Sequence, residues 1–450
     1  MNTVSTTVNP QAQDLEFTHQ LRRAKIAAAT GTALDQMEMT LFSLAAALVF
    51  GHVFFGDTSP AVALIASFGV YGVGFLIRPI GGLIFSHLGE TKGRKWVLST
   101  TVMMMGAATF GIGLIPSWQT IGIFAPLLLI LARCVQGAAV GAEYTSGTTY
   151  LTEIAPIGRR GRTASWVWAG ASAGTVLGAL VWFVVMSVFT KQQVLDWAWR
   201  IPFWMTIFVT FFAMWLRRRL QESPVFVEKQ KAFKQRAENA APLALAFKNS
   251  KLNMLRVFGL TFPCVGHSFL YQAFMAGYFV NYVVKDGDGG KIFSSATSVG
   301  AVVGIGGALL GGYLSDKLGR RTAGLIYTTI MMIFPPIAFL LINTGQFAAV
   351  VAVMIFCFCF PAEGAMGVQS PQLPEIFGAR NRYSAQTVAR EIGAIGGGLL
   401  PMIATAIMAA FEMWVPVAIM MVILMAGAVL TTYLTPETKD RDLYELDDAM

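Results

Sequence analysis

Ionisable residues inside long apolar runs are the first candidates for chemistry in this sequence. Asp35 and Glu38 lie three residues apart in the first run, and Arg133 lies in the fourth. Residues three apart share one face of a helix, so the two acids would point the same way. A charge near the centre of a bilayer costs about 3 kcal/mol on insertion scales, so ionisable residues there are functional candidates. The others of this kind are Arg78, Glu143, Glu363, Arg390 and Glu391.

The carboxyl groups of Asp35 and Glu38 are the candidates for binding a proton. Beside an apolar cavity, a carboxyl group can take up and release a proton near neutral pH. Arg133 would be the counter-charge: it pairs with the ionised acid and is released to bind an anionic substrate when the acid is protonated. A static ion pair that only fixes helix packing is the alternative, and we favour proton coupling. Which of the two acids carries the proton stays open.

Polar and aromatic side chains in neighbouring apolar runs could bind a substrate. Gln136 follows Arg133 by three residues and faces the same way, and Tyr271 and Tyr278 lie seven residues apart. Each aromatic side chain taken alone is more often ordinary packing. Beside an arginine, the set would suit an anionic hydroxy or keto acid. The substrate-binding candidates are Arg133, Gln136, Trp168, Tyr271, Gln272, Tyr278, Asn281, Gln369 and Arg390.

Two further expectations concern groups within the apolar runs. Arg390 and Glu391 are adjacent, so on a helix their side chains point about 100° apart. One of them would line the cavity while the other pairs with a neighbouring helix. His267 is expected to be a packing residue with satisfied hydrogen bonds rather than a proton relay.

The composition indicates that these residues belong to a membrane protein. Of the 450 residues, 55% are hydrophobic and 13% are charged, whereas soluble proteins average about 45–50% apolar and about 25% charged residues. A membrane-spanning helix needs about 20 predominantly apolar residues. The apolar runs predict twelve spans, at residues 26–51, 60–86, 96–115, 121–144, 164–189, 200–216, 257–284, 293–314, 323–342, 347–369, 386–410 and 414–434.

Basic residues predict the orientation of these spans. Lys and Arg gather in the N-terminal tail, in the loops after even-numbered spans and in the C-terminal tail. Because cytoplasmic loops carry an excess of positive charge, both termini are expected in the cytoplasm. The net charge of +8 does not gather on one soluble module, so no nucleic-acid partner is expected.

The chain divides into two similar halves. Residues 86–95 follow the second span and residues 312–321 follow the eighth, and both segments carry an acid followed by a Gly-Arg-basic triplet. Duplicated halves with a site between them are typical of transporters that rock one half against the other. The predicted parts are a cytoplasmic N-terminal tail at 1–25, a six-helix half at 26–216, a cytoplasmic linker at 217–256, a second six-helix half at 257–434 and a cytoplasmic C-terminal tail at 435–450.

The segment 312–321 reads Gly-x-Leu-x-Asp-x-x-Gly-Arg-Arg and resembles the signature loop of the major facilitator superfamily. Residues 75–82, 133–144 and 199–203 resemble segments of its bacterial metabolite:proton symporter branch, and residues 120–129 resemble the shikimate-transporter-like members. The resemblance implies an all-α polytopic membrane protein with twelve helices in two pseudo-symmetric halves. It also implies a monomer that moves a small organic acid together with protons.

The first span departs from the pattern of that branch. Residues 35–39 read Asp-Gln-Met-Glu-Met, where the family has an acid, two aromatic residues and Asp. Stacking of a substrate on aromatic rings at this place is therefore not carried over. Ser86 and Glu90 also stand where the family prefers Gly and Asp.

Charged residues near the cytoplasmic ends of the spans are expected to form gates. Arg78 would pair with a loop acid such as Glu90. Asp316, Glu375 and Arg320 or Arg321 would form a network in the second half. The gating candidates are Arg78, Glu90, Arg94, Glu143, Glu153, Arg162, Asp316, Arg320 and Glu375.

Enzymatic and ATP-driven functions are not expected. The sequence has no Gly-x-x-x-x-Gly-Lys phosphate loop, no paired metal-ligand spacing and no nucleophile elbow, so no cofactor or metal is predicted. The leading function is proton-coupled import of a small organic acid such as shikimate or an oxo acid. A zwitterion or osmolyte symporter, an exporter and a non-transporting ligand receptor are the alternatives. Osmosensing relatives carry a long C-terminal extension, whereas the tail after Thr435 is short here.

Overall fold

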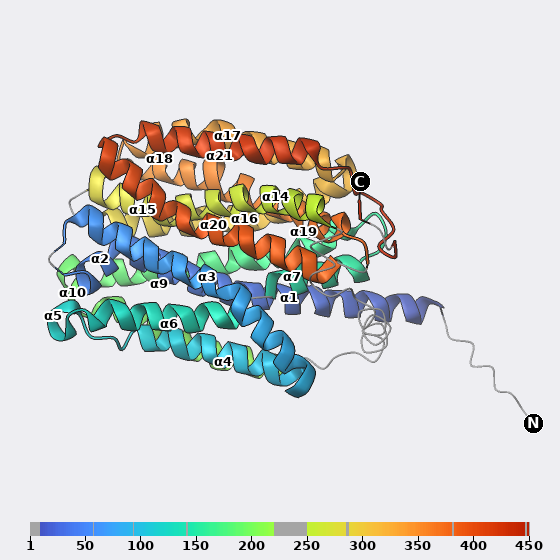
Figure 1. Ribbon diagram of the computed structural model, residues 1–450, viewed down its shortest axis with the longest axis horizontal. Helices are drawn as coiled ribbons and strands as arrows, with labels where there is room; N and C mark the ends of the chain where they lie inside the picture. Colours follow the sequence, from blue (N-terminus) through green and yellow to red (C-terminus); the bar gives the residue numbers. More distant parts are fainter. Residues whose placement is uncertain are drawn as a thin grey trace, which may run out of the picture.

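The protein is a bundle of helices, seen in a computed structural model (Figure 1). The structure describes residues 10–56, 58–92, 94–140, 143–219, 250–284, 288–379, 382–445 and 448–449, and these residues form helices and no strands. Among them, eight helical segments are each long and apolar enough to cross a membrane, and Thr100–Ile112 and Ala198–Phe212 are shorter apolar helices. The predicted all-α membrane fold is confirmed.

The first half contains six long helical segments, joined by short helices. The long segments are α1 (Pro10–Leu48), α3 (Pro60–Lys92), α4 (Arg94–Ile112), α6 with α7 (Phe124–Val140 and Glu143–Ile154), α8 with α9 (Arg160–Ala164 and Trp166–Val188) and α11 (Ile201–Arg219). The short ones are α2 (Phe50–Phe54), α5 (Trp118–Ile121), α10 (Lys191–Asp196) and the single turn η1 (Ala198–Arg200).

The second half also contains six long segments, and two of them include wider π-helical turns. The first is α14 (Lys251–Phe269), which continues through η2 (Leu270–Phe274), α15 (Met275–Tyr278) and η3 (Phe279–Val283). Turns of this kind are frequent at functional sites. The other five are α16 (Gly289–Leu318), α17 (Arg320–Ile342), α18 with η4 and α19 (Phe347–Ala352, Val353–Cys359 and Phe360–Ile376), α20 (Arg382–Phe411) and α21 (Val415–Leu434).

Several helices extend beyond the apolar runs that predicted them. The fourth span, expected at 121–144, continues as α7 to Ile154, and the tenth, expected at 347–369, continues to Ile376. A helix satisfies its own backbone hydrogen bonds on either side of the membrane boundary, so hydropathy alone does not mark where it ends. The predicted linker at 217–256 falls mainly on residues 220–249, which lie outside the described part of the chain.

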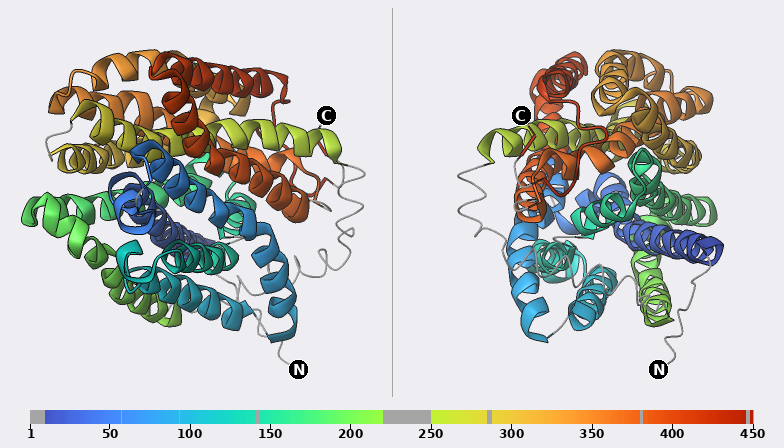
Figure 2. Two further views of the ribbon diagram at one scale, coloured as in Figure 1. Left: turned by 60° about the vertical axis from the view of Figure 1, so that its left-hand side comes forward. Right: turned by 90° about the vertical axis from the view of Figure 1, so that its right-hand side faces the viewer.

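The two six-helix halves lie side by side along the length of the bundle (Figures 1 and 2). They meet along two pairs of helices, α9 with α16 and α3 with α20. We call the end that carries α8 and the C-terminal segment 435–445 the tail end. The opposite end, which carries α2 and α10, is the far end.

Small residues let neighbouring helices approach at backbone distance. Along α16 and α19, a Cβ atom at Gly311 would collide with the carbonyl oxygen of Gly364, and one at Gly307 would lie 2.7 Å from the carbonyl oxygen of Phe360. Such contacts are typical of membrane helices, where close packing replaces the hydrophobic effect as the driving force between helices. Gly306, also on α16, differs from Gly311, because a Cβ atom there would have no neighbouring atom within 4 Å.

We predict that Gly311→Ala destabilises the folded protein and that Gly306→Ala does not. The added methyl group at Gly311 forces α16 and α19 apart, and overpacking of this kind costs about 1–3 kcal/mol. At Gly306 the helix propensity of alanine leaves stability unchanged or slightly raised. Thermal unfolding of the purified variants in detergent measures both changes. Equal melting temperatures for the two variants would contradict the close approach of these helices.

Candidate substrate and proton sites

The Arg133 guanidinium lies inside the first half, within a cage of aromatic rings. The residue is 1% exposed, and its Cζ atom lies 4.2 Å from the centre of the Phe42 ring, 5.1 Å from Tyr71 and 6.0 Å from Phe75. The negative faces of aromatic rings attract a cation, and the attraction strengthens where water is excluded. The cage therefore stabilises a buried charge that has no carboxylate within ion-pair distance among the described residues.

A chain of hydrogen bonds connects Arg133 to one of the predicted proton carriers. Arg133 Nη1 donates to Gln136 Oε1 over 3.1 Å, Gln136 Nε2 lies 2.6 Å from Thr109 Oγ1, and this hydroxyl lies 2.7 Å from Glu38 Oε2. All four side chains are buried. The acid and the arginine are thus coupled through two neutral groups.

The other acid, Asp35, lies beside a different arginine from the one expected. Arg78 Nη2 is 3.9 Å from Asp35 Oδ1, and both residues are buried, at 4% and 0% exposure. The guanidinium also lies 4.5 Å from the centre of the Phe75 ring. The partner of Arg78 that the structure describes is Asp35; a contact with Glu90 stays a prediction, because the Glu90 side chain lies outside the described part of the chain. Arg133 is not the ion-pair partner of Asp35: Arg78 takes that place.

A small cavity, which we call the central pocket, lies between the two halves. Its volume of about 10 Å³ holds about one water molecule. The first half contributes α7 and α9, and the second contributes α14, α19 and α20. The lining residues are Tyr144, Thr148, Trp168, Thr261, Val265, Met366, Gln369, Ser370, Leu373 and Arg390.

The central pocket unites three of the predicted substrate-binding residues. Arg390 Cζ lies 4.7 Å from the centre of the Tyr144 ring, and Trp168 stacks on the same ring with centroids 5.1 Å apart. Gln369 Nε2 donates to the Leu260 carbonyl oxygen over 3.1 Å. Tyr144 was not among the predicted binding residues, although its position next to Glu143 in a predicted span could have indicated it.

The remaining candidates lie away from this pocket. Gln136 and Arg133 are in the first half, as described above. Tyr271 is fully buried and stacks on Phe358, with ring centroids 5.5 Å apart, and Gln272 is 3% exposed. The Tyr271 hydroxyl and Gln272 Oε1 have no hydrogen-bond partner among the described residues. These two residues lie in the π-helical turn η2.

Tyr278 and Asn281 lie toward the far end. The Tyr278 hydroxyl donates to Asn343 Oδ1 over 2.6 Å, and Asn281 Nδ2 donates to the Gly277 carbonyl oxygen over 2.7 Å. Asn281 also lines a cavity of about 150 Å³ together with His52 and Lys191. Tyr278 and Asn281 are therefore separated from the central pocket by several helical turns.

Two sequence-based expectations for intramembrane groups are corrected. Arg390 and Glu391 bond to each other, with 2.8 Å between Nη1 and Oε1, because the long arginine side chain bends back over the neighbouring residue. His267 is fully buried beside Tyr271, but both of its ring nitrogens lack a hydrogen-bond partner in the described part of the chain. It is a packing residue, as expected, but not a satisfied one.

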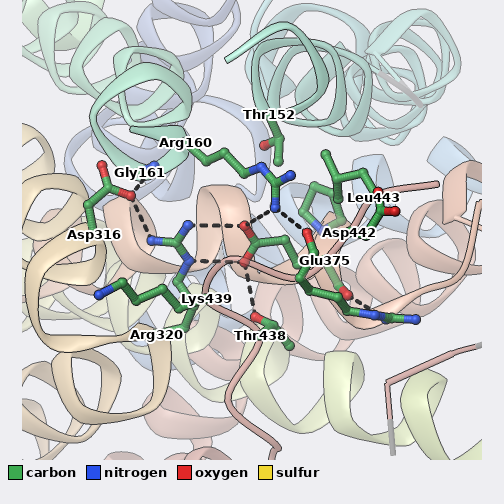
Figure 3. A network of polar contacts seen from close by, with 12 residues as sticks. Thr152, Arg160, Gly161, Asp316, Arg320, Glu375, Thr438, Lys439, Asp442 and Leu443 are labelled. Atoms are coloured by element: carbon green, nitrogen blue, oxygen red, sulfur yellow. Dashed lines mark hydrogen bonds and ion pairs between the residues drawn. The ribbon is translucent and has the colours of Figure 1, made fainter. Parts of the chain in front are cut away.

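Charged residues join the halves at the tail end (Figure 3). The Arg320 guanidinium binds Glu375 through two contacts of 3.0 Å and Asp316 through one of 2.8 Å. Asp316 in turn accepts hydrogen bonds from the backbone amides of Gly161, at 2.7 Å, and Arg162, at 2.9 Å. Glu375 lies 3.5 Å from Arg160 Nη1. We call Arg160, Asp316, Arg320 and Glu375 the tail-end network.

The other gating candidates have separate positions. Glu153 pairs with Arg382 of the second half, at 3.2 Å. Arg162 contributes its backbone to the tail-end network, while its guanidinium lies over the Tyr313 ring. The side chains of Glu90, Arg94 and Glu143 lie outside what the structure describes.

The C-terminal segment, predicted only as a tail, is part of this network. Glu437 accepts hydrogen bonds from the first backbone amides of α17, Arg320 at 2.8 Å and Arg321 at 3.0 Å. The Thr438 hydroxyl donates to Glu375 Oε2 over 3.0 Å, and Arg160 donates to the Arg441 carbonyl oxygen over 2.6 Å. A carboxylate at a helix N-terminus is stabilised by the unpaired amides and the helix dipole.

The two halves also touch on the far-end side of the central pocket. A Cβ at Gly277 would lie 3.2 Å from Leu64 and 3.4 Å from Phe68, so these side chains of α3 rest on α15 across the boundary of the halves. Together with the tail-end network, this packing holds the two halves together on both sides of the central pocket, and we call this arrangement the occluded form.

Comparison with known proteins identifies the family. The family model described as Major Facilitator Superfamily matches residues 28–373. YdfJ of Escherichia coli (strain K12) is 36% identical over 416 residues, which are 92% of this chain and 96% of that protein. The shikimate transporter of the same organism is 33% identical over 426 residues, covering 93% of this chain and 94% of that protein.

Two further comparisons cover nearly the whole chain. The proline/betaine transporter of Escherichia coli (strain K12) is 32% identical over 436 residues, covering 94% of this chain and 85% of that protein. The crystal structure of a D-xylose-proton symporter has the same fold, with a TM-score of 0.72, 17% identity and coverage of 94% of this chain and 100% of that one. The chain therefore belongs to the major facilitator superfamily of membrane transporters and has its twelve-helix fold.

Proposed function

We propose that this chain is a proton-coupled symporter that imports a small organic acid across a bacterial inner membrane, with both termini in the cytoplasm. The central pocket carries the proposal, since it lies between the halves and holds the Arg390 guanidinium among aromatic and amide side chains. A substrate carboxylate would bind this guanidinium by charge-assisted hydrogen bonds. The similarity to a shikimate transporter supports an acid as substrate.

Glu38 is suited to carry the proton because of its hydrogen-bond partner. The Thr109 hydroxyl lies 2.7 Å from Glu38 Oε2 and 2.8 Å from the carbonyl oxygen of Met105. A hydroxyl has one proton and cannot donate fully to both oxygens. When Glu38 is protonated, it donates to Thr109, which then donates to Met105, and both contacts are satisfied. Asp35 stays a candidate beside Arg78.

The tail-end network is proposed as the cytoplasmic gate. Its bonds cross from Asp316 and Glu375 in the second half to Gly161 and Arg160 in the first. Rocking the halves apart at this end must break these contacts, and re-forming them closes the path again. In alternating access, the inward-facing form is the one in which this network is open.

A zwitterionic osmolyte is the second candidate substrate. The stacked rings of Tyr144 and Trp168 offer aromatic faces that would suit a quaternary ammonium group, while Arg390 would bind the carboxylate. The similarity to a proline/betaine transporter supports this alternative.

Uptake into proteoliposomes with an alkaline interior tests the proposal. The panel contains shikimate, 2-oxoglutarate, citrate, benzoate and glycine betaine, each with and without a protonophore. We expect protonophore-sensitive accumulation of one acid, and a loss of at least tenfold in Arg390→Gln, since a charged hydrogen bond contributes about 1.5–3 kcal/mol. Arg22→Gln, at an exposed position, is the control. Accumulation of betaine alone would favour the osmolyte symporter over the organic-acid symporter. Binding of a compound without uptake would indicate a receptor.

Asp35→Asn and Glu38→Gln, compared separately, identify the coupling acid. The variant that removes the proton carrier should lose accumulation driven by the pH gradient and retain exchange of labelled for unlabelled substrate. We expect this result for Glu38→Gln. Normal accumulation by both variants would place the proton site elsewhere.

Asp316→Asn should open the tail-end network without changing substrate affinity greatly. Ser165 is fully buried beside Gly312 of the other half. In a variant whose four native cysteines are replaced by serine, a cysteine at position 165 therefore reacts with a maleimide only when the halves separate. We expect maleimide labelling at least tenfold faster in Asp316→Asn than in the Ser165→Cys parent. Asp196→Asn at the far end, an acid bonded to Gln192, is the matched control. Unchanged labelling would remove Asp316 from the gate.

A further inference from the structure

Glu363 is a buried acid on α19 that the proposed mechanism does not use. It is 9% exposed, and its Oε2 atom has no hydrogen-bond partner among the described residues. Every ion pair found in the described part of the chain involves other acids. An ionised carboxylate without a cation, at membrane depth, costs several kcal/mol.

The surroundings of Glu363 leave little room for water. A Cβ atom at Gly304 of α16 would lie 3.2 Å from Glu363 Cγ and 3.3 Å from Cys359 Cβ, so the acid packs directly on the backbone of α16. The groups around it that can titrate are Cys359, one turn earlier on its own helix, and Tyr144 of α7. Neither group can carry a positive charge, and Arg390 is bonded to Glu391.

The first half presents a hydroxyl group to this acid. Ser172 of α9 lies within hydrogen-bonding reach of the Glu363 carboxyl group. Its own proton is directed to the carbonyl oxygen of Trp168, 3.1 Å away. While that bond is kept, Ser172 can only accept a hydrogen bond from Glu363, and the proton of this contact then comes from the acid.

This arrangement repeats the one at Glu38. In each case the acid meets a hydroxyl group that already donates to a carbonyl oxygen four residues earlier in its helix, Met105 for Thr109 and Trp168 for Ser172. The difference is location. Glu38 and Thr109 belong to the same half, whereas Glu363 and Ser172 belong to opposite halves. Ser172 lies one helical turn from Trp168, and Glu363 lies one turn from Met366; both Trp168 and Met366 line the central pocket.

We propose that Glu363 is a second proton-binding site, and that its neutral carboxyl group joins the two halves by donating to Ser172 in the occluded form. After loss of the proton, Ser172 has to give up its bond to the Trp168 carbonyl oxygen in order to donate to the carboxylate, and a charge remains in an apolar contact. Separation of α9 from α19 brings water to the carboxylate and relieves both. Proton occupancy at Glu363 thus favours closure around the central pocket. This role rests on the proposed symport function and adds a second proton to it.

Infrared spectroscopy of the purified full chain in lipid tests the site without any substrate. A neutral carboxylic acid gives a C=O stretching band that an ionised carboxylate lacks. At pH 7.5 we expect such a band in the wild type, a lower intensity in Glu363→Gln and an unchanged intensity in Asp35→Asn. Because a neutral Glu38 would contribute to the same band, the spectra are compared in a Glu38→Gln background as well, where Glu363→Gln should remove the rest of it. In Ser172→Ala the band should shift, because the bond across the halves is removed. An unchanged band in Glu363→Gln, with the fold intact by circular dichroism, would overturn the proposal.

Transport measurements test the coupling, with shikimate as the probe. Glu363→Gln should exchange labelled shikimate at a rate within threefold of the wild type but lose most of the accumulation driven by a pH gradient. Glu363→Asp should restore part of it. Full accumulation by Glu363→Gln would overturn the coupling role. Should the wild type transport no panel compound, the symport proposal fails, while the infrared result still decides whether Glu363 holds a proton.

Discussion

The Arg320 guanidinium is the group on which the closed form of the protein depends. It bonds Asp316 and Glu375 at once, and each of these acids also contacts the first half, through the amides of Gly161 and Arg162 or through Arg160. Because these charges are buried together, removing one leaves the others uncompensated, at a cost of about 3–5 kcal/mol. The same guanidinium thereby fixes α16, α17, α19 and the start of α8 in one arrangement.

The low dielectric constant of the membrane makes the same demand on the charged groups between the tail end and the far end: each needs a group that stabilises it. Charges inside the bundle persist only where another group stabilises them, and the protein uses three ways to do so. Arg133 is caged by aromatic rings, Asp35 lies beside Arg78, and Glu38 lies against a hydroxyl. Each arrangement depends on the charge that its group carries. The proposed proton coupling uses this dependence, which has the same cause as the cost of burying these residues.

Much of the fold could be predicted because its signals are local. Apolar runs long enough to cross the bilayer gave the number and order of the helices, and the twin acid-Gly-Arg segments gave the two halves. The sequence also indicated Asp316, Arg320 and Glu375, since they are charges next to spans. It did not indicate that the C-terminal segment completes their network through Glu437 and Thr438, because a short acidic tail carries no pattern of its own.

By itself, the sequence determined which residues are membrane-embedded charges and on which helices they lie, since hydropathy and spacing along one chain segment suffice for that. The tertiary structure alone decided their partners: Arg78 rather than Arg133 for Asp35, Glu391 for Arg390, and Tyr144 beside the central pocket. These pairings depend on how each helix is rotated and how closely it approaches its neighbours. That geometry is set by contacts such as Gly311 against Gly364, between residues distant in the chain.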